Sequence, residues 1–85
     1  MGTEALLAVA HAFCAARGLK LSTVSGLVLN DWKRLGQIES GADITVGRLT
    51  AVMQRFSDNW PDGAAWPVDV PRPAPAVDKN RRERS

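Results

Sequence analysis

The strongest periodic pattern in the chain is an apolar stripe between Thr45 and Pro61. Its members are spaced 3, 1, 3 and 4 residues apart, as on one buried face of an α-helix: Leu49, Val52, Met53, Phe56 and Trp60. Thr45 is a suitable N-cap, and Pro61 restricts the residue before it, so the helix is expected to end by residue 59 or 60. Such a helix needs a second apolar face to cover it.

A second apolar stripe, near the N-terminus, supplies such a face. Its members follow the same three-and-four spacing: Leu6, Val9, Ala10 and Phe13. This spacing predicts a helix over residues 4–17, with Thr3 as its N-cap and Gly18 as its terminator.

The segment 23–29 is rich in β-branched residues, so a strand is an alternative there. It lacks clean polar–apolar alternation, however, and no second strand-like run follows it. A short helix capped by Ser22 is therefore favoured.

Residues 32–40 are expected to form the next helix, because Asn30 and Asp31 can cap its start and Gly41 can end it. At 100° per residue, the inward side would carry Leu35 and Ile38. The outward side would be polar and carry Lys33, Gly36, Gln37 and Ser40. Two short helices in this order satisfy the geometry of a helix-turn-helix, with the motif at residues 21–41.

The length of 85 residues allows one small domain with an appendage. Residues 1–69 are predicted to be the helix-turn-helix domain. Residues 70–85 are rich in proline and then basic and polar, which predicts an extended, polyproline-like and disordered tail. The expected fold is all-α: a small bundle of about four helices with a C-terminal tail.

Several classes of function are disfavoured by the composition. The chain has one cysteine, Cys14, which excludes an intramolecular disulfide and suits the reducing cytoplasm. The apolar stretch at residues 5–13 is too short to cross a bilayer and lacks a basic flank, so neither a membrane partner nor a signal peptide is expected. His11 is the only histidine, which disfavours a zinc site, a catalytic triad and hence an enzyme; no cofactor is expected.

The charge is unevenly distributed along the chain. Residues 17–55 carry six basic and three acidic side chains, and residues 70–85 carry five basic and two acidic ones. The remaining segments, 1–16 and 56–69, carry four acidic residues and no Lys or Arg. A basic middle between acidic flanks suits a domain that is oriented on a polyanion, although an ordinary solvated surface explains the charges equally well.

Residues 35–41, Leu-Gly-Gln-Ile-Glu-Ser-Gly, resemble the segment Ile-Ser-x-Ile-Glu-x-Gly of Cro-like, phage-repressor-like DNA-binding domains. Residues 24–25, Val-Ser, resemble the Leu-Ala pair of that family's first motif helix, and residues 44–56 resemble its following core helix. Asp31 stands where the family has a capping Ser, whereas Leu29 stands where it usually has a turn glycine. An Asp at the turn with Leu four residues on also resembles a group of short bacterial helix-turn-helix regulators.

The resemblance implies a sequence-specific transcriptional regulator of a bacterium, phage or other mobile genetic element. Such a protein would be a repressor that binds an inverted-repeat operator in double-stranded DNA as a homodimer. The residues expected at bases or in the groove are Asn30, Trp32, Lys33, Arg34, Gly36, Gln37 and Ser40. The residues expected at phosphates are Lys20, Ser22, Thr23, Thr45 and Arg48.

The outward side of the expected recognition helix is the part of the surface on which the DNA hypothesis depends. Lys33 and Gln37 lie one turn apart there, so Lys33 suits a guanine edge or a phosphate and Gln37 an adenine edge. The alternative is that both are simply solvated. Trp32 is expected about 90° from the outward centre on an ideal helix, which favours packing at the edge of the core over contact with a thymine methyl group. The DNA hypothesis requires this side to be open to solvent and convex.

The alternative function is a helix-turn-helix protein-interaction module, an antiactivator that binds another regulator and not DNA. The small net charge of +2 and the two Trp-Pro pairs favour it. The residues expected at a protein or dimer interface are Phe56, Trp60 and Trp66. Packing of Trp60 against the other helices is the competing interpretation, because Trp60 continues the helix stripe.

Overall fold

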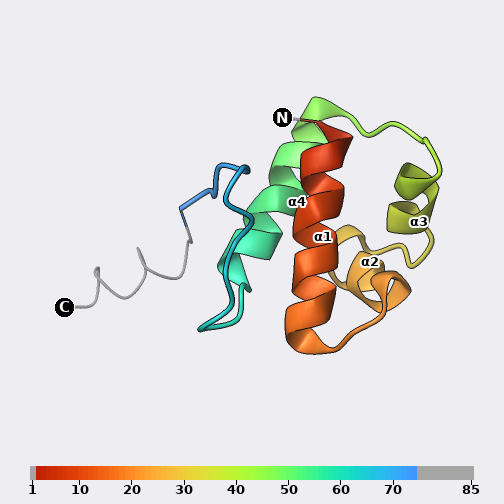
Figure 1. The fold of residues 1–85 in the computed structure, drawn as a ribbon. Helices are drawn as coiled ribbons and strands as arrows, with labels where there is room; N and C mark the ends of the chain where they lie inside the picture. The colour runs from red at the N-terminus through yellow and green to blue at the C-terminus, as the bar shows by residue number, and fades with distance from the viewer. Residues whose placement is uncertain (1, 75–85) are drawn as a thin grey trace, which may run out of the picture.

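A computed structural model describes residues 2–74, which form four helices and a C-terminal segment (Figure 1). The helices are α1 (Thr3–Arg17), α2 (Leu21–Leu29), α3 (Arg34–Glu39) and α4 (Val46–Asp58). No strand occurs in this part of the chain, so the predicted all-α fold is confirmed and the strand alternative for residues 23–29 is wrong. In Figure 1, α1 and α4 lie side by side, and the segment after α4 runs along α4 on the side away from α3.

The predicted helix faces are confirmed for α1 and α4. All nine residues of the two stripes are buried. Gly18 ends α1 with a φ of 66°, a left-handed conformation that glycine adopts at low cost. The Thr45 hydroxyl accepts a hydrogen bond of 3.3 Å from the Arg48 N–H, so Thr45 caps α4 as predicted. The spacing of apolar residues was therefore sufficient to place both helices and the faces they bury.

The predicted N-caps of the first two helices, Thr3 and Ser22, are wrong. α1 begins at Thr3 with Gly2 in the N-cap position, and α2 begins at Leu21 with Lys20 in that position. Neither helix has a side-chain cap hydrogen bond. The Ser22 hydroxyl therefore does not start α2, whose stability depends on the residues that it buries in the core.

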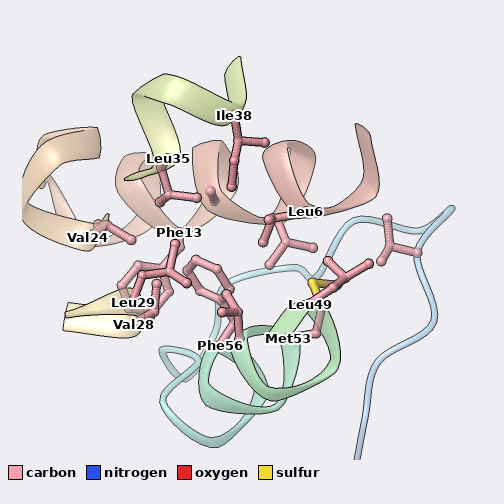
Figure 2. Packing of buried hydrophobic residues seen from close by; sticks show 14 of the residues in the cluster. Leu6, Phe13, Val24, Val28, Leu29, Leu35, Ile38, Leu49, Met53 and Phe56 are labelled. Carbon is pink, nitrogen blue, oxygen red and sulfur yellow. The ribbon is translucent and has the colours of Figure 1, made fainter. Parts of the chain in front are cut away.

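The core is centred on aromatic residues from α1 and α4. The Phe13 ring lies 5.3 Å from that of Phe56 in an edge-on arrangement and 5.7 Å from that of Trp60. Figure 2 shows Leu35 and Ile38 of α3 reaching this core from the other side. Phe56 is 0% exposed and Trp60 is 9% exposed, so the prediction that they belong to an interface is wrong.

The C-terminal segment, residues 60–74, folds back onto α4. The Trp66 ring lies 4.7 Å from that of Trp60, and its Nε1–H donates to the Val70 carbonyl over 2.8 Å. Val70 is itself buried. Trp66 is thus half-buried within the domain, which leaves little of it for the predicted interface.

The last described residues are also held on α4. The Arg72 guanidinium donates to the carbonyl and hydroxyl oxygens of Ser57 over 2.8 and 3.0 Å and lies 5.5 Å from the Trp66 ring centre. The Ser57 hydroxyl donates to the Pro73 carbonyl. The packed domain therefore continues to at least residue 74, beyond the predicted boundary at residue 69. The rest of the predicted tail, residues 75–85, lies outside the described residues.

Within residues 2–74, no single helix is long and apolar enough to cross a membrane. α1 and α2 reach the required length and composition only when they are taken together. The chain bends by 113° between them.

Candidate nucleic-acid interface

The turn between α2 and α3 is made by Asn30. Its φ is 56°, and it is the only non-glycine residue with a positive φ in the described part of the chain. Asparagine tolerates this left-handed conformation better than most residues, and the Asn30 N–H donates to the Gly26 carbonyl over 3.1 Å. The turn therefore needs no glycine at Leu29. The sequence signal for this turn was an Asn directly after the last apolar residue of α2.

Asp31 supports the start of α3 from a position outside the helix. Its Oδ1 accepts from the Lys33 N–H over 3.0 Å, and its carbonyl accepts from the Arg34 N–H over 3.2 Å. α3 begins at Arg34, with Lys33 in the N-cap position. The predicted start at residue 32 is therefore two residues too early, and the predicted N-cap at Asn30 or Asp31 is wrong. Trp32 and Lys33 belong to the turn.

Ser25 joins α2, the turn and α3. It is 0% exposed, and its hydroxyl donates to the Asp31 carbonyl over 2.5 Å. The same Oγ accepts from the N–H of Leu35 over 2.9 Å. Because Leu35 lies in the first turn of α3, its N–H has no partner within the helix. Sequence reasoning missed this role, since the only signal was a small residue where the resemblance has Ala.

The remaining contacts of α3 fix it from both ends. The Arg34 side chain donates to the Asp43 carbonyl over 2.7 Å, and Nε2 of His11 lies 2.7 Å from Oε2 of Glu39. Arg34 is half-buried and donates to the loop before α4, so its guanidinium already has a partner within the domain, and its predicted place in the DNA groove stays a prediction. α3 thus presents one polar side on a rigid support.

The outward side of this unit is exposed, as the helical spacing predicts. Lys33, Gly36, Gln37 and Ser40 are all exposed. They line an open groove of about 640 Å³ together with Trp32, Leu21, Ser22 and Ala42, which we name the recognition groove. This side is therefore open to solvent as expected, but between α3 and the start of α2 it is a shallow depression and not the convex surface that was expected.

Trp32 stands on this groove with 66% of its surface exposed, so the prediction that it packs on the core is wrong. The physical reason is the later start of α3, since the 100° rotation per residue of a helix does not apply to a residue in the turn. The Lys33 Nζ lies 5.8 Å from the Trp32 ring centre. The two side chains thus form a cation–aromatic pair on the exposed side.

The structure divides the predicted phosphate contacts between different places. Thr45 and Arg48 line a second groove of about 660 Å³, between the C-terminal end of α2 and α4, together with Asn30. Ser22 lies in the recognition groove, whereas Lys20 and Thr23 are exposed near the start of α2 and line neither groove. Asn30 therefore lines the second groove and not the recognition groove.

Arg55, which sequence reasoning did not single out, also lines the second groove. Its Nη1 donates to the Val28 carbonyl over 2.8 Å. The second groove thus has two arginines, Arg48 and Arg55, along one side of α4.

No cluster of three or more metal-binding side chains (His, Cys, Asp or Glu) occurs among residues 2–74. Cys14 is partly buried, and the loss of water around its thiol raises the pKa, more than a backbone hydrogen bond lowers it. The thiol is therefore mainly protonated at neutral pH.

Comparison with known proteins gives no relative: no family model, no curated protein and no solved structure matches the chain. The resemblance to Cro-like domains thus remains a prediction from residues 20–57.

Proposed function

We propose that this protein binds double-stranded DNA through the exposed side of α3, which borders the recognition groove, and acts as a transcriptional regulator in the cytoplasm. The observation that carries the proposal is the α2–turn–α3 unit, whose inner side is fixed by Ser25, Leu35 and Ile38. Its outer side leaves Lys33 and Gln37 exposed. A short helix held in this way can enter a major groove, where Lys suits guanine and Gln suits adenine.

Exposed cations near this unit support the proposal. Lys20 precedes α2, Lys33 precedes α3, and Arg48 lies in the first turn of α4. Each is exposed, and none has an ionic partner among the described residues. Such side chains are available to phosphates, which supply the sequence-independent part of DNA affinity.

A homodimer on an inverted repeat fits the small size of the contact surface. α3 has six residues, so one domain offers few base contacts. Two domains on half-sites about one DNA turn apart would double these contacts. Repression is the simplest outcome, because a bound dimer of this size can block polymerase without a further module.

The test is DNA binding by the full chain, with fragments first selected from genomic DNA and affinities then measured by fluorescence anisotropy at several salt concentrations. Lys33→Ala should reduce the slope of log affinity against log salt by about one if Lys33 contacts a phosphate. If Lys33 reads a base, discrimination at one position should instead relax by about 1–3 kcal/mol.

Two further variants sharpen this test. Gln37→Ala should relax preference at another position while leaving the salt slope unchanged, because the side chain is neutral. Arg17→Ala is the matched control for lost charge, since Arg17 is exposed and lines neither the recognition groove nor the second groove. Failure of the full chain to form a sequence-preferring complex at moderate salt contradicts the proposal.

One observation favours the alternative function, a protein-interaction module. The recognition groove is lined largely by apolar groups, and Trp32 on it is an exposed aromatic residue of the kind enriched at protein interfaces. The two Trp-Pro pairs give this alternative little support, because Trp60 and Trp66 pack within the domain. Retention of a transcription regulator on the immobilised chain, lost in Trp32→Ala, together with absence of DNA binding, would support this alternative.

A further inference from the structure

Trp32 is the one tryptophan of the three that does not pack against the core. Trp60 is 9% exposed and Trp66 packs against it, whereas Trp32 is 66% exposed in the turn before α3. An exposed indole gains nothing from the hydrophobic effect unless it is covered by something else. Its position on the recognition groove indicates a binding role.

The surroundings of Trp32 limit what can cover it. Leu21 and Ala42 add apolar surface to the groove, and Lys33 is the only charged residue among the described residues that line it. A Cβ added at Gly36 would meet no atom within 4 Å, so the groove is open next to the α3 backbone. The occupant must therefore offer an apolar group and, close to it, negative charge or hydrogen-bond acceptors for Lys33.

The major groove of DNA offers this combination at thymine. The C5 methyl group of thymine is the apolar group on that surface, and it lies beside the O4 acceptor and within reach of the phosphates. Adenine, guanine and cytosine present no methyl group there. Resting on the proposed function, we propose that Trp32 is a specificity residue that reads a thymine in each half-site through this methyl group.

The Lys33 ammonium group adds a charged hydrogen-bond donor beside the apolar Trp32 ring. With Nζ 5.8 Å from the Trp32 ring centre, the ammonium group stands on the same exposed surface as the indole. A methyl group against the ring would leave Lys33 free to donate to an acceptor or phosphate next to it. Trp32 and Lys33 then act as one unit, with an apolar and a cationic part.

The experiment removes the methyl group and the indole separately. In the DNA fragment that the full chain prefers, each thymine is replaced in turn by deoxyuracil, which lacks only the C5 methyl group. Affinity is measured for the wild type and for Trp32→Ala. We expect one position in each half-site at which deoxyuracil weakens wild-type binding about fourfold, as for one buried methyl group.

In Trp32→Ala, deoxyuracil at that position should no longer change the affinity, while its effect at other positions should stay as in the wild type. Val46→Ala is the matched control, because Val46 is 79% exposed and does not line the recognition groove. It should keep the wild-type deoxyuracil profile. Trp32→Leu, which keeps an apolar side chain, serves if the alanine variant binds too weakly, and should show a reduced loss at the same position.

The outcomes separate this inference from the proposed function. If the wild type prefers a DNA sequence but the deoxyuracil profile is the same with and without Trp32, the thymine contact is wrong and DNA binding stands. If no DNA sequence is preferred, both proposals are overturned. Melting of Trp32→Ala near the wild-type temperature shows that any loss of binding is not due to unfolding.

Discussion

Replacement of Ser25 by alanine tests the view that one buried hydroxyl positions the recognition helix. The Ser25 Oγ is inaccessible to water and takes part in two hydrogen bonds, one with the Leu35 N–H and one with the Asp31 carbonyl. Ser25→Ala would leave the buried Leu35 N–H without a partner, at a cost of about 1–3 kcal/mol. Loss of the bond to Asp31 adds about 1 kcal/mol.

These losses are partly offset, because alanine is the better helix former by up to about 0.5 kcal/mol. The free energy of unfolding should therefore fall by about 1.5–3.5 kcal/mol. In a domain of this size, each 1 kcal/mol shifts the melting temperature by about 4–8 °C. A decrease of at least about 6 °C is expected.

Ser22→Ala is the matched control for Ser25→Ala. Ser22 lies in the same helix and is exposed, and α2 has no side-chain cap hydrogen bond. The substitution changes helix propensity in the same direction but removes no buried bond, so the stability should stay within about 0.5 kcal/mol of the wild type. Urea unfolding followed by circular dichroism measures both variants, and amide exchange reports whether the Leu35 N–H opens more often.

Resemblance and structure give opposite predictions for this substitution. Residues 24–25 resemble a Leu-Ala pair, so the resemblance alone implies that alanine is acceptable at Ser25. The hydrogen bonds imply that it is not. Equal stabilities of Ser25→Ala and Ser22→Ala would refute the reasoning that the hydroxyl holds α3.

Three further outcomes are expected. Gly36→Ala should raise the free energy of unfolding by up to about 1 kcal/mol, because alanine is the better helix former and an added Cβ meets no atom within 4 Å. The same substitution should weaken DNA binding if the α3 backbone approaches DNA at this residue. Thermal melting measures the first effect and fluorescence anisotropy the second. Arg72→Ala should lower stability by about 1–2 kcal/mol in urea unfolding through the lost bonds to α4, whereas Val68→Ala, at a position 94% exposed, should change nothing measurable. Burial raises the pKa of the Cys14 thiol, so its alkylation at neutral pH should be slower than that of a free cysteine. The raised pKa means that the folded state holds the thiol proton more tightly than the unfolded state, which stabilises the fold. This stabilisation is complete below the ordinary thiol pKa and is lost as the pH rises through the raised value.

The exposed side of α3 could be predicted from the sequence, whereas the positions of the Trp32 and Arg34 side chains could not. Gly36, Gln37 and Ser40 are exposed as the helical spacing indicates. Trp32 and Arg34 were misplaced because α3 begins two residues later than expected. Cap and turn residues such as Asn30 and Asp31 allow several starting points, and the choice among them depends on contacts with other elements.

The sequence by itself determined the helical framework. Apolar spacing predicts the buried faces of α1 and α4, and Gly18, Thr45 and Pro61 mark three of their ends, because these signals act within one or two helical turns.

Only the tertiary structure decided how α3 is held, where Trp32 lies and that Arg72 is bound to Ser57 on α4. Each of these depends on partners several to many residues away in the chain. The partners of a buried hydroxyl or a guanidinium are fixed by packing, and a local pattern of residue types does not contain that information.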